Sequence, residues 1–166
     1  MTSDDTCHPV AGEEVCPFLY GPVGVAVEGR IDGSPWQVIW YLDALNGLCV
    51  GYRASNDLYD VANCHPWGPA EPLIRLGSGI LPLGRRASHR LVFGPVTPLA
   101  ASVELDFGAG RKLTLYPLRM NDSLSVFVYG PIPIGQPYPI AATALRPDGT
   151  VLGRDKPDAC SEYRGC

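Results

Sequence analysis

The chain has 166 residues and a formal net charge of −4 at pH 7, a length that suits one domain with a single hydrophobic core. Its 19 glycines and 17 prolines exclude a helical bundle, because both residue types destabilise helix interiors. No apolar run approaches the roughly 20 residues of a membrane helix, and the negative charge gives no whole-chain attraction for nucleic acid. We therefore expect one all-β domain over residues 1–166, with irregular, cysteine-bearing ends at about 1–22 and 154–166.

Alternating apolar residues predict three strands in the first half of the chain, at Val23–Glu28, Trp36–Asp43 and Leu48–Arg53. Asn46-Gly47 lies between the second and third of these strands and is a strong hairpin signal. Trp36 and Trp40 fall on one face of the second strand. We assign that face to the core, with a carbohydrate-stacking platform as the alternative.

Residues 54–88 show no clear period, and we expect them to be irregular. Ser55, Asn56 and Asp57 can cap a short helical turn that continues to Ala62.

A period of two returns after residue 88, with a turn at Gly94-Pro95. The strands predicted there are His89–Phe93, Ala100–Phe107, Arg111–Leu118, Leu124–Tyr129, Pro139–Arg146 and Thr150–Leu152. Eight or nine strands in total, separated by short turns, predict an antiparallel β-sandwich of immunoglobulin-like or Greek-key type.

Six cysteines predict disulfides in an oxidising compartment. Cys49 and Cys64 flank the irregular segment and are the pair that we favour most. For the other four we favour Cys7–Cys16 and Cys160–Cys166 over a clasp that joins the two ends. Free buried thiols and a metal site remain alternatives, although zinc sites usually contain close-spaced cysteine pairs that this chain lacks.

The first ten residues are polar and do not have the character of a signal peptide. Because a disulfide-bonded protein must reach an oxidising compartment, we expect that a signal peptide or anchor precedes the sequence and has been removed, with a cytosolic protein as the alternative. The predicted location is therefore secreted or extracytoplasmic, with a membrane or lipid tether outside this chain as an option.

Several segments together resemble extracytoplasmic domains of actinobacterial proteins whose role is unknown. They are Val92–Leu105, Arg111–Tyr116, Val126–Tyr129 and Ala141–Leu145 in the second half, with Trp36–Tyr41 and Gly47–Val50 in the first. The resemblance implies an exported β-sandwich, often tethered to the membrane, with no established catalysis. It transfers no functional residue to this chain.

A basic stretch is the first candidate binding feature. No acidic residue lies between Glu71 and Glu104, whereas Arg75, Arg85, Arg86 and Arg90 all fall there with His89. Such a stretch suits anionic lipid headgroups, cell-wall phosphates or an acidic partner. The alternative is an ordinary solvated surface.

Two proline-rich segments that contain aromatic residues are the second candidate. Residues 64–69 include Trp67, and residues 131–139 include Ile132, Ile134 and Tyr138. Both segments must run extended, and a rigid loop that displays apolar side chains is typical of a binding surface. The alternative is a loop that folds back to cap the end of the sandwich.

Catalytic signals are weak. Ser88 and His89 are adjacent and would point to opposite faces of a strand, and no nucleophile-elbow motif is present. We therefore predict no catalytic residue, metal ligand or cofactor, and a binding domain that recognises a protein or cell-envelope partner. The alternatives are a secreted hydrolase that uses a metal or the carboxylates Asp57, Asp60 and Glu71, and a lectin-like carbohydrate-binding module.

Overall fold

The structure is a computed structural model that describes residues 8–10, 13–15, 19–43, 47–54, 58–65, 73–83 and 86–156. Within these ranges the chain is all-β without a helix, and every strand pairing is antiparallel. The prediction of an antiparallel all-β protein is confirmed. None of the described residues belongs to a helix with the length and apolar character that a membrane crossing requires.

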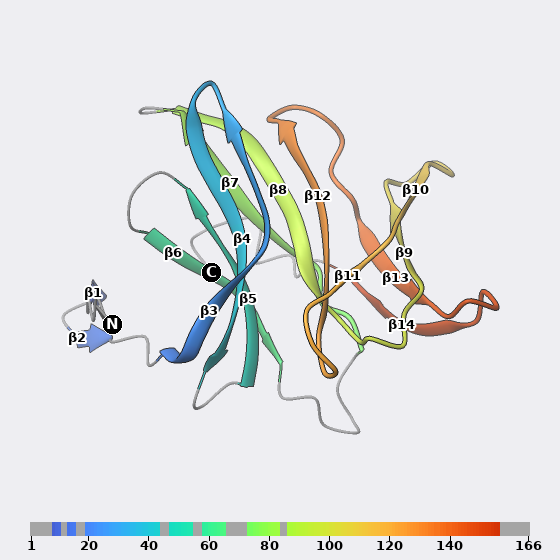
Figure 1. Cartoon of the computed structure of the whole chain (residues 1–166). Coiled ribbons are helices and arrows are strands. Elements are labelled where there is room, and N and C mark those ends of the chain that lie inside the picture. The colour runs from blue at the N-terminus through green and yellow to red at the C-terminus, as the bar shows by residue number, and fades with distance from the viewer. Residues whose placement is uncertain are drawn as a thin grey trace.

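The strands form three four-stranded sheets and one separate hairpin (Figure 1). The first sheet has the order β3 (Leu19–Ile31), β4 (Ser34–Asp43), β5 (Gly47–Ala54) and β6 (Leu58–His65). The central sheet has the order β11 (Leu118–Arg119), β12 (Ser125–Pro133), β8 (Arg86–Val96) and β7 (Gly77–Leu83). The third sheet has the order β10 (Lys112–Leu115), β9 (Ser102–Asp106), β13 (Ala141–Leu145) and β14 (Val151–Asp155). The hairpin consists of β1 (His8–Val10) and β2 (Glu13–Val15).

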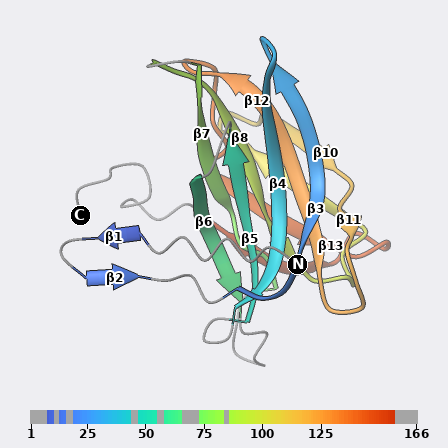
Figure 2. The same cartoon turned by 60° about the vertical axis from the view of Figure 1, so that its left-hand side comes forward.

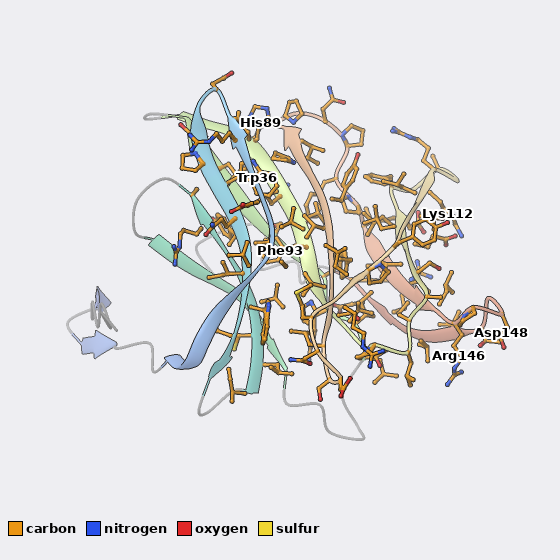
Figure 3. The ribbon with its side chains drawn as sticks, in the orientation of Figure 1. Trp36, His89, Phe93, Lys112, Arg146 and Asp148 are labelled. Atoms are coloured by element: carbon orange, nitrogen blue, oxygen red, sulfur yellow. The ribbon has the colours of Figure 1, made fainter. Side chains whose placement is uncertain are left out.

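The central sheet is buried on both faces. Leu91 and Phe93 of β8 pack against the first sheet in one cluster, which we call the first core. Val92 and Val96 of the same strand pack against the third sheet in another cluster, the second core. Figure 2 shows the first sheet in front of β7 and β8, and in Figure 3 Trp36 and Phe93 point into the layer between β4 and β8.

This layering explains the sequence of β8. All residues from Leu91 to Thr97 are buried. The second half of β8, Leu91–Val96, is accordingly a run without charged or polar side chains rather than an alternating one, as expected for a strand covered on both sides. β12 follows the same rule, since Val126 belongs to the first core and Phe127 to the second. The layers are therefore three, where the strand pattern alone predicted the two sheets of a simple sandwich.

The strand count differs from the prediction because several strands lie in segments that were expected to be irregular. The described residues form fourteen strands instead of eight or nine. Residues 1–22 contain β1, β2 and the start of β3, and residues 54–88 contain β6 and β7. The expected helical turn is wrong for residues 58–62, because β6 pairs with β5 from Leu58 to His65 with one bulge at Ala62, and such pairing outweighs a local capping signal. The expected capping residues 55–57 lie outside the described residues.

The expected turn at Gly94-Pro95 is also wrong, because β8 continues through it to Val96. The Pro95 carbonyl accepts a hydrogen bond from the Arg75 amide at 3.0 Å. In an antiparallel ladder the two main-chain groups of a residue point to the same side, so the missing proline N–H faces Arg75 and not β12. The pairing of β8 with β12 is thereby preserved.

The tryptophans of β4 occupy the core as predicted. Trp36 is buried in the first core, and Trp40 packs against the same cluster. Glycines on the neighbouring strand leave room for both rings, since a Cβ on Gly24 or Gly29 would overlap the indole of Trp40 or Trp36. Leu42, two residues beyond Trp40, is 48% exposed near the end of the strand.

Candidate functional site

A groove lies between the β9–β10 end of the third sheet and the end of β12 in the central sheet. Its volume is about 420 Å³. We call it the edge groove, and it is lined by Phe107, Arg111, Lys112, Leu113, Tyr129, Ile132, Pro133, Gln136 and Pro137. The first four come from the third sheet and its turn, and the other five from β12 and the residues that follow it. Such a volume lies in the range of small-ligand and side-chain pockets.

The β9–β10 turn positions one wall of the groove. The Phe107 amide donates to the Arg111 carbonyl at 2.9 Å, and the Arg111 amide donates to the Gly108 carbonyl at 3.0 Å. Asp106 Oδ1 accepts a hydrogen bond from the Gly108 amide at 2.8 Å. Gly108 and Gly110 have φ values of +79° and +77°, a conformation that glycine adopts without steric cost. The turn therefore holds Phe107 and Arg111 side by side.

Residues 131–139, the proline loop, form the opposite wall. Its start is held in the sheet, where Ile132 pairs with Arg90. Its middle is closed by a hydrogen bond from the Gln136 amide to the Pro133 carbonyl at 3.2 Å. Directly after the loop, the Ile140 amide donates to the Asp106 carbonyl at 2.7 Å. The loop is thus anchored at both ends and stiffened by its prolines.

Aromatic rings form the interior of the groove. Phe107 and Tyr129 pack edge to face, with 5.8 Å between ring centroids and an interplanar angle of 74°. The Arg111 guanidinium lies 6.0 Å from the centroid of Phe107, at the outer limit for a cation–π contact. Beside the groove, the Arg90 guanidinium lies 4.8 Å from the centroid of Tyr138. Each of the two arginines at this end of the molecule therefore lies over an aromatic ring, Arg111 over Phe107 and Arg90 over Tyr138.

Lys112 is the second basic residue of the groove lining, and its ammonium is directed to Glu104 on the outer face of the third sheet. Its Nζ lies 2.7 Å from Glu104 Oε1 on the neighbouring strand, and the lysine side chain is 53% exposed. The hydrogen bond and the charge of Glu104 raise the pKa of Lys112 above 10.5. In Figure 3 Lys112 lies on the third sheet, on the far side of the molecule from Trp36.

Replacing Glu104 by glutamine is expected to lower the pKa of Lys112 toward 10.5, because the side-chain hydrogen bond is weakened and the attracting charge is removed. The stabilisation from this pair is full between neutral pH and pH 10.5 and is lost as the pH rises through the raised pKa of Lys112. An NMR titration that follows Lys112 Cε and Nζ measures the change. Asp122→Asn, which removes a carboxylate engaged with Arg119 instead, serves as the control. An unchanged pKa in Glu104→Gln would contradict the assignment.

The residues predicted in the proline loop divide into two groups. Ile132 and Tyr138 are half-buried and pack against the second core. Ile134 is 48% exposed at the loop surface. The loop therefore covers the end of the sheets with two apolar residues, as expected for a capping loop. It also exposes a third apolar residue, as expected for a binding surface.

The predicted basic stretch is divided by the structure. Arg90 lies beside the proline loop, whereas Arg75 contacts Pro95 near the other end of β8. At about 3.3 Å per residue along a strand, these two positions are roughly 16 Å apart. His89 pairs with Pro133 and adjoins the loop. Arg86 begins β8, with a side chain outside the described part.

Other candidates fall outside the described residues. These are Arg85, Trp67, the potential hydrolase residues Asp57 and Glu71, and the cysteines Cys7, Cys16, Cys160 and Cys166. Asp60 lies in β6, with a side chain outside the described part. Within that part, no group of three potential metal-ligating side chains comes together.

Replacing Ile134 by serine is expected to change the free energy of unfolding by less than about 0.5 kcal/mol, because the side chain is already 48% exposed. Replacing Ile132 by serine is expected to lower the free energy of unfolding by about 1–2 kcal/mol, because the Ile132 side chain packs on the second core. Urea unfolding of the two single variants measures both effects. Equal destabilisation would contradict this division of the loop.

Sequence reasoning missed most of the groove. Phe107, Arg111, Lys112 and Tyr129 were assigned only to strands and turns, because the juxtaposition of the β9–β10 turn with β12 depends on sheet packing. The signal available was Arg111-Lys112 directly after the glycine-rich turn that ends the most regular amphipathic strand. This signal identifies two basic residues, but it does not identify the residues of β12 and the proline loop that form the other side of the groove.

Comparisons of the chain with family models, with curated proteins and with solved structures find no match.

Proposed function

We propose that the chain is a non-catalytic, extracytoplasmic binding domain of β-sandwich type that recognises a protein or cell-envelope partner through the edge groove. The observation that carries this proposal is the composition of the groove. Its walls combine two aromatic rings, aliphatic side chains and prolines with the guanidinium of Arg111, and the ammonium of Lys112 lies on the adjoining outer face. These groups provide burial, stacking and charge, which are the components of recognition.

The rigidity of the walls supports the same function. One wall is a turn with three main-chain or Asx-type hydrogen bonds, and the other is a proline loop tied down at both ends. A preformed surface loses little conformational entropy when a partner binds. The resemblance to actinobacterial extracytoplasmic domains agrees with this proposal and suggests a tether outside the chain.

A groove-filling variant tests the function. Gln136 is exposed and lines the groove, so Gln136→Trp should occlude it without disturbing the core. The immobilised protein is exposed to a solubilised envelope fraction of the producing organism. The expected result is a component that is retained by the wild type, lost with Gln136→Trp and recovered chemically unchanged.

Ser123→Trp is the matched control. Ser123 is exposed just before β12, at the end of that strand opposite the proline loop. Its amide donates to Asn121 Oδ1 at 2.8 Å, a bond that the substitution keeps. Equal capture by wild type and Gln136→Trp would contradict binding at the groove. Conversion of the captured component to a product would contradict a non-catalytic role and favour the hydrolase alternative.

Disulfide stabilisation is part of the same proposal. Cys49 is buried, and Cys64 lies directly opposite it in the register of β5 and β6. We propose Cys64 as its partner, since directly opposed residues have the closest Cβ atoms. A peptide map of the unreduced protein is expected to show the two cysteines in one linked fragment. A Cys49 fragment linked to any other cysteine would contradict the pairing.

A further inference from the structure

Resting on the proposed function, we infer that the partner supplies an extended acidic peptide that adds to β10 as a fifth strand of the third sheet and places an apolar side chain in the edge groove. The order β10-β9-β13-β14 leaves β10 at an edge within the described sheet. Open edges of this kind are templates for strand addition.

The hydrogen bonds of the β9–β10 turn establish which main-chain groups are available. Phe107 and Arg111 form a hydrogen-bonded pair, because the Phe107 amide donates to the Arg111 carbonyl. Bonded and non-bonded pairs alternate in an antiparallel ladder. The next pair, Lys112 with Asp106, is therefore non-bonded toward β9, and the same holds for the pair of Thr114 with Glu104. The N–H and C=O groups of Lys112 and Thr114 consequently point outward.

The strand edge on the other side of the groove, the later part of β12, is less suited to pair with an added strand than β10 is. β11 pairs only with Ser125 and Val126 of β12, so the later part of β12 has no partner strand on that side among the described residues. Pro131 and Pro133 lie in this later part and lack the N–H that a ladder requires. β10 contains no proline. Of the two strand edges that border the groove, β10 is the one able to form a regular ladder.

The charge of the groove determines the chemistry of the peptide. Arg111 lines the groove beside Phe107, Lys112 holds its ammonium on the adjoining outer face of the sheet, and Arg90 lies just beyond the groove on Tyr138. Glu104 pairs with Lys112 but leaves the charges of Arg111 and Arg90 without a compensating carboxylate among the groove residues. Acidic side chains of a bound strand complement these cations.

The alternation of a strand also fits the pocket. Leu113 packs against the second core, whereas Lys112 reaches Glu104 on the outer face. A strand beside β10 would alternate in the same way, with every second side chain directed between the sheets. There it would meet Phe107, Tyr129 and Ile132. An aromatic or large aliphatic residue is the side chain that these walls accept.

The test uses synthetic nine-residue peptides in which threonine and valine alternate. The central residue is phenylalanine, and the two residues after it are glutamates. Because neighbouring residues of a strand face opposite sides, each face of the bound peptide carries one carboxylate. Two further peptides carry N-methyl groups on alternate residues, one set for each edge of the strand. Binding to the whole protein is measured by fluorescence anisotropy. N-methyl groups on the edge that faces β10 should raise the dissociation constant by at least about tenfold. N-methyl groups on the other edge should leave the dissociation constant within about twofold of that of the unmodified peptide.

Amide exchange provides a readout that does not depend on a folded variant. The amides of Lys112 and Thr114 are expected to become protected when the peptide binds, because their N–H groups point outward. The amides of Leu113 and Leu115, which face β9, should be protected already. Equal effects of the two N-methyl sets, or unchanged exchange at Lys112 and Thr114, would overturn strand addition.

Three further measurements separate this inference from the proposed function. A glutamine version of the peptide that binds equally well would overturn the acidic specificity. Binding to vesicles of anionic phosphatidylglycerol, with none to the peptide, would overturn a peptide partner. If no peptide binds while envelope capture remains sensitive to Gln136→Trp, strand addition fails and the proposed function stands. If envelope capture is insensitive to Gln136→Trp as well, both fail.

Discussion

Replacing Gly94 by alanine is expected to lower the free energy of unfolding by more than about 3 kcal/mol. A Cβ at this position would lie 1.8 Å from the Arg75 carbonyl oxygen and 3.0 Å from the ring of Phe127. The first neighbour is backbone, held by the hydrogen bond between the Arg75 amide and Pro95. It cannot move aside without breaking the connection between β8 and residues 73–76.

Gly153→Ala is the matched control for Gly94. Gly153 also lies in a strand, but the nearest atoms to its Cβ would be at 3.4 and 3.6 Å, on Leu73 and Ile74. That is ordinary contact, so the free energy of unfolding is expected to stay within about 1 kcal/mol of the wild type. Urea unfolding of both variants measures the difference. Similar stabilities would contradict a tight approach of Arg75 to β8.

The fold class and the strands with one buried face were predictable from the sequence. Val103 and Leu105 of β9 alternate with polar residues, and the structure buries both. β8 was predicted only in part, because a strand buried on both faces has no alternation to detect. Its glycine and proline at 94 and 95 gave a turn signal. That signal is overridden by the nearby chain, which supplies Arg75 as a hydrogen-bond donor.

The candidate site was predicted less well than the fold. The proline loop was identified because Ile132, Ile134 and Tyr138 occur where a connection is usually polar. Its opposite wall comes from residues about 25 positions earlier, and only the packing of the third sheet on the central sheet brings them together. Arg90 could be identified as basic, but its position over Tyr138 depends on the register of β8 with β12. Long-range register has no signal in a single sequence.

Replacing either Phe93 or Phe127 by alanine is expected to lower the free energy of unfolding by about 3–5 kcal/mol. The two rings are almost fully buried and project from neighbouring strands of the central sheet. Phe93 belongs to the first core and contacts Tyr52, at 5.9 Å between ring centroids. Phe127 belongs to the second core. Each substitution therefore leaves a cavity in a different layer.

Both variants are expected to unfold in one cooperative transition, because the two cores share β8 and β12. Trp36 and Trp40 report on the first core alone, in a Trp67→Phe background that removes the third tryptophan. Phe127→Ala should move the midpoint of this tryptophan fluorescence as far as it moves the midpoint of the circular dichroism of the whole chain. If the fluorescence midpoint stays at its wild-type value while the circular dichroism shifts, the two cores unfold independently. A central sheet that forms one face of each core cannot lose its packing on one side and keep its strand geometry on the other, and this coupling is the physical basis for expecting a single domain.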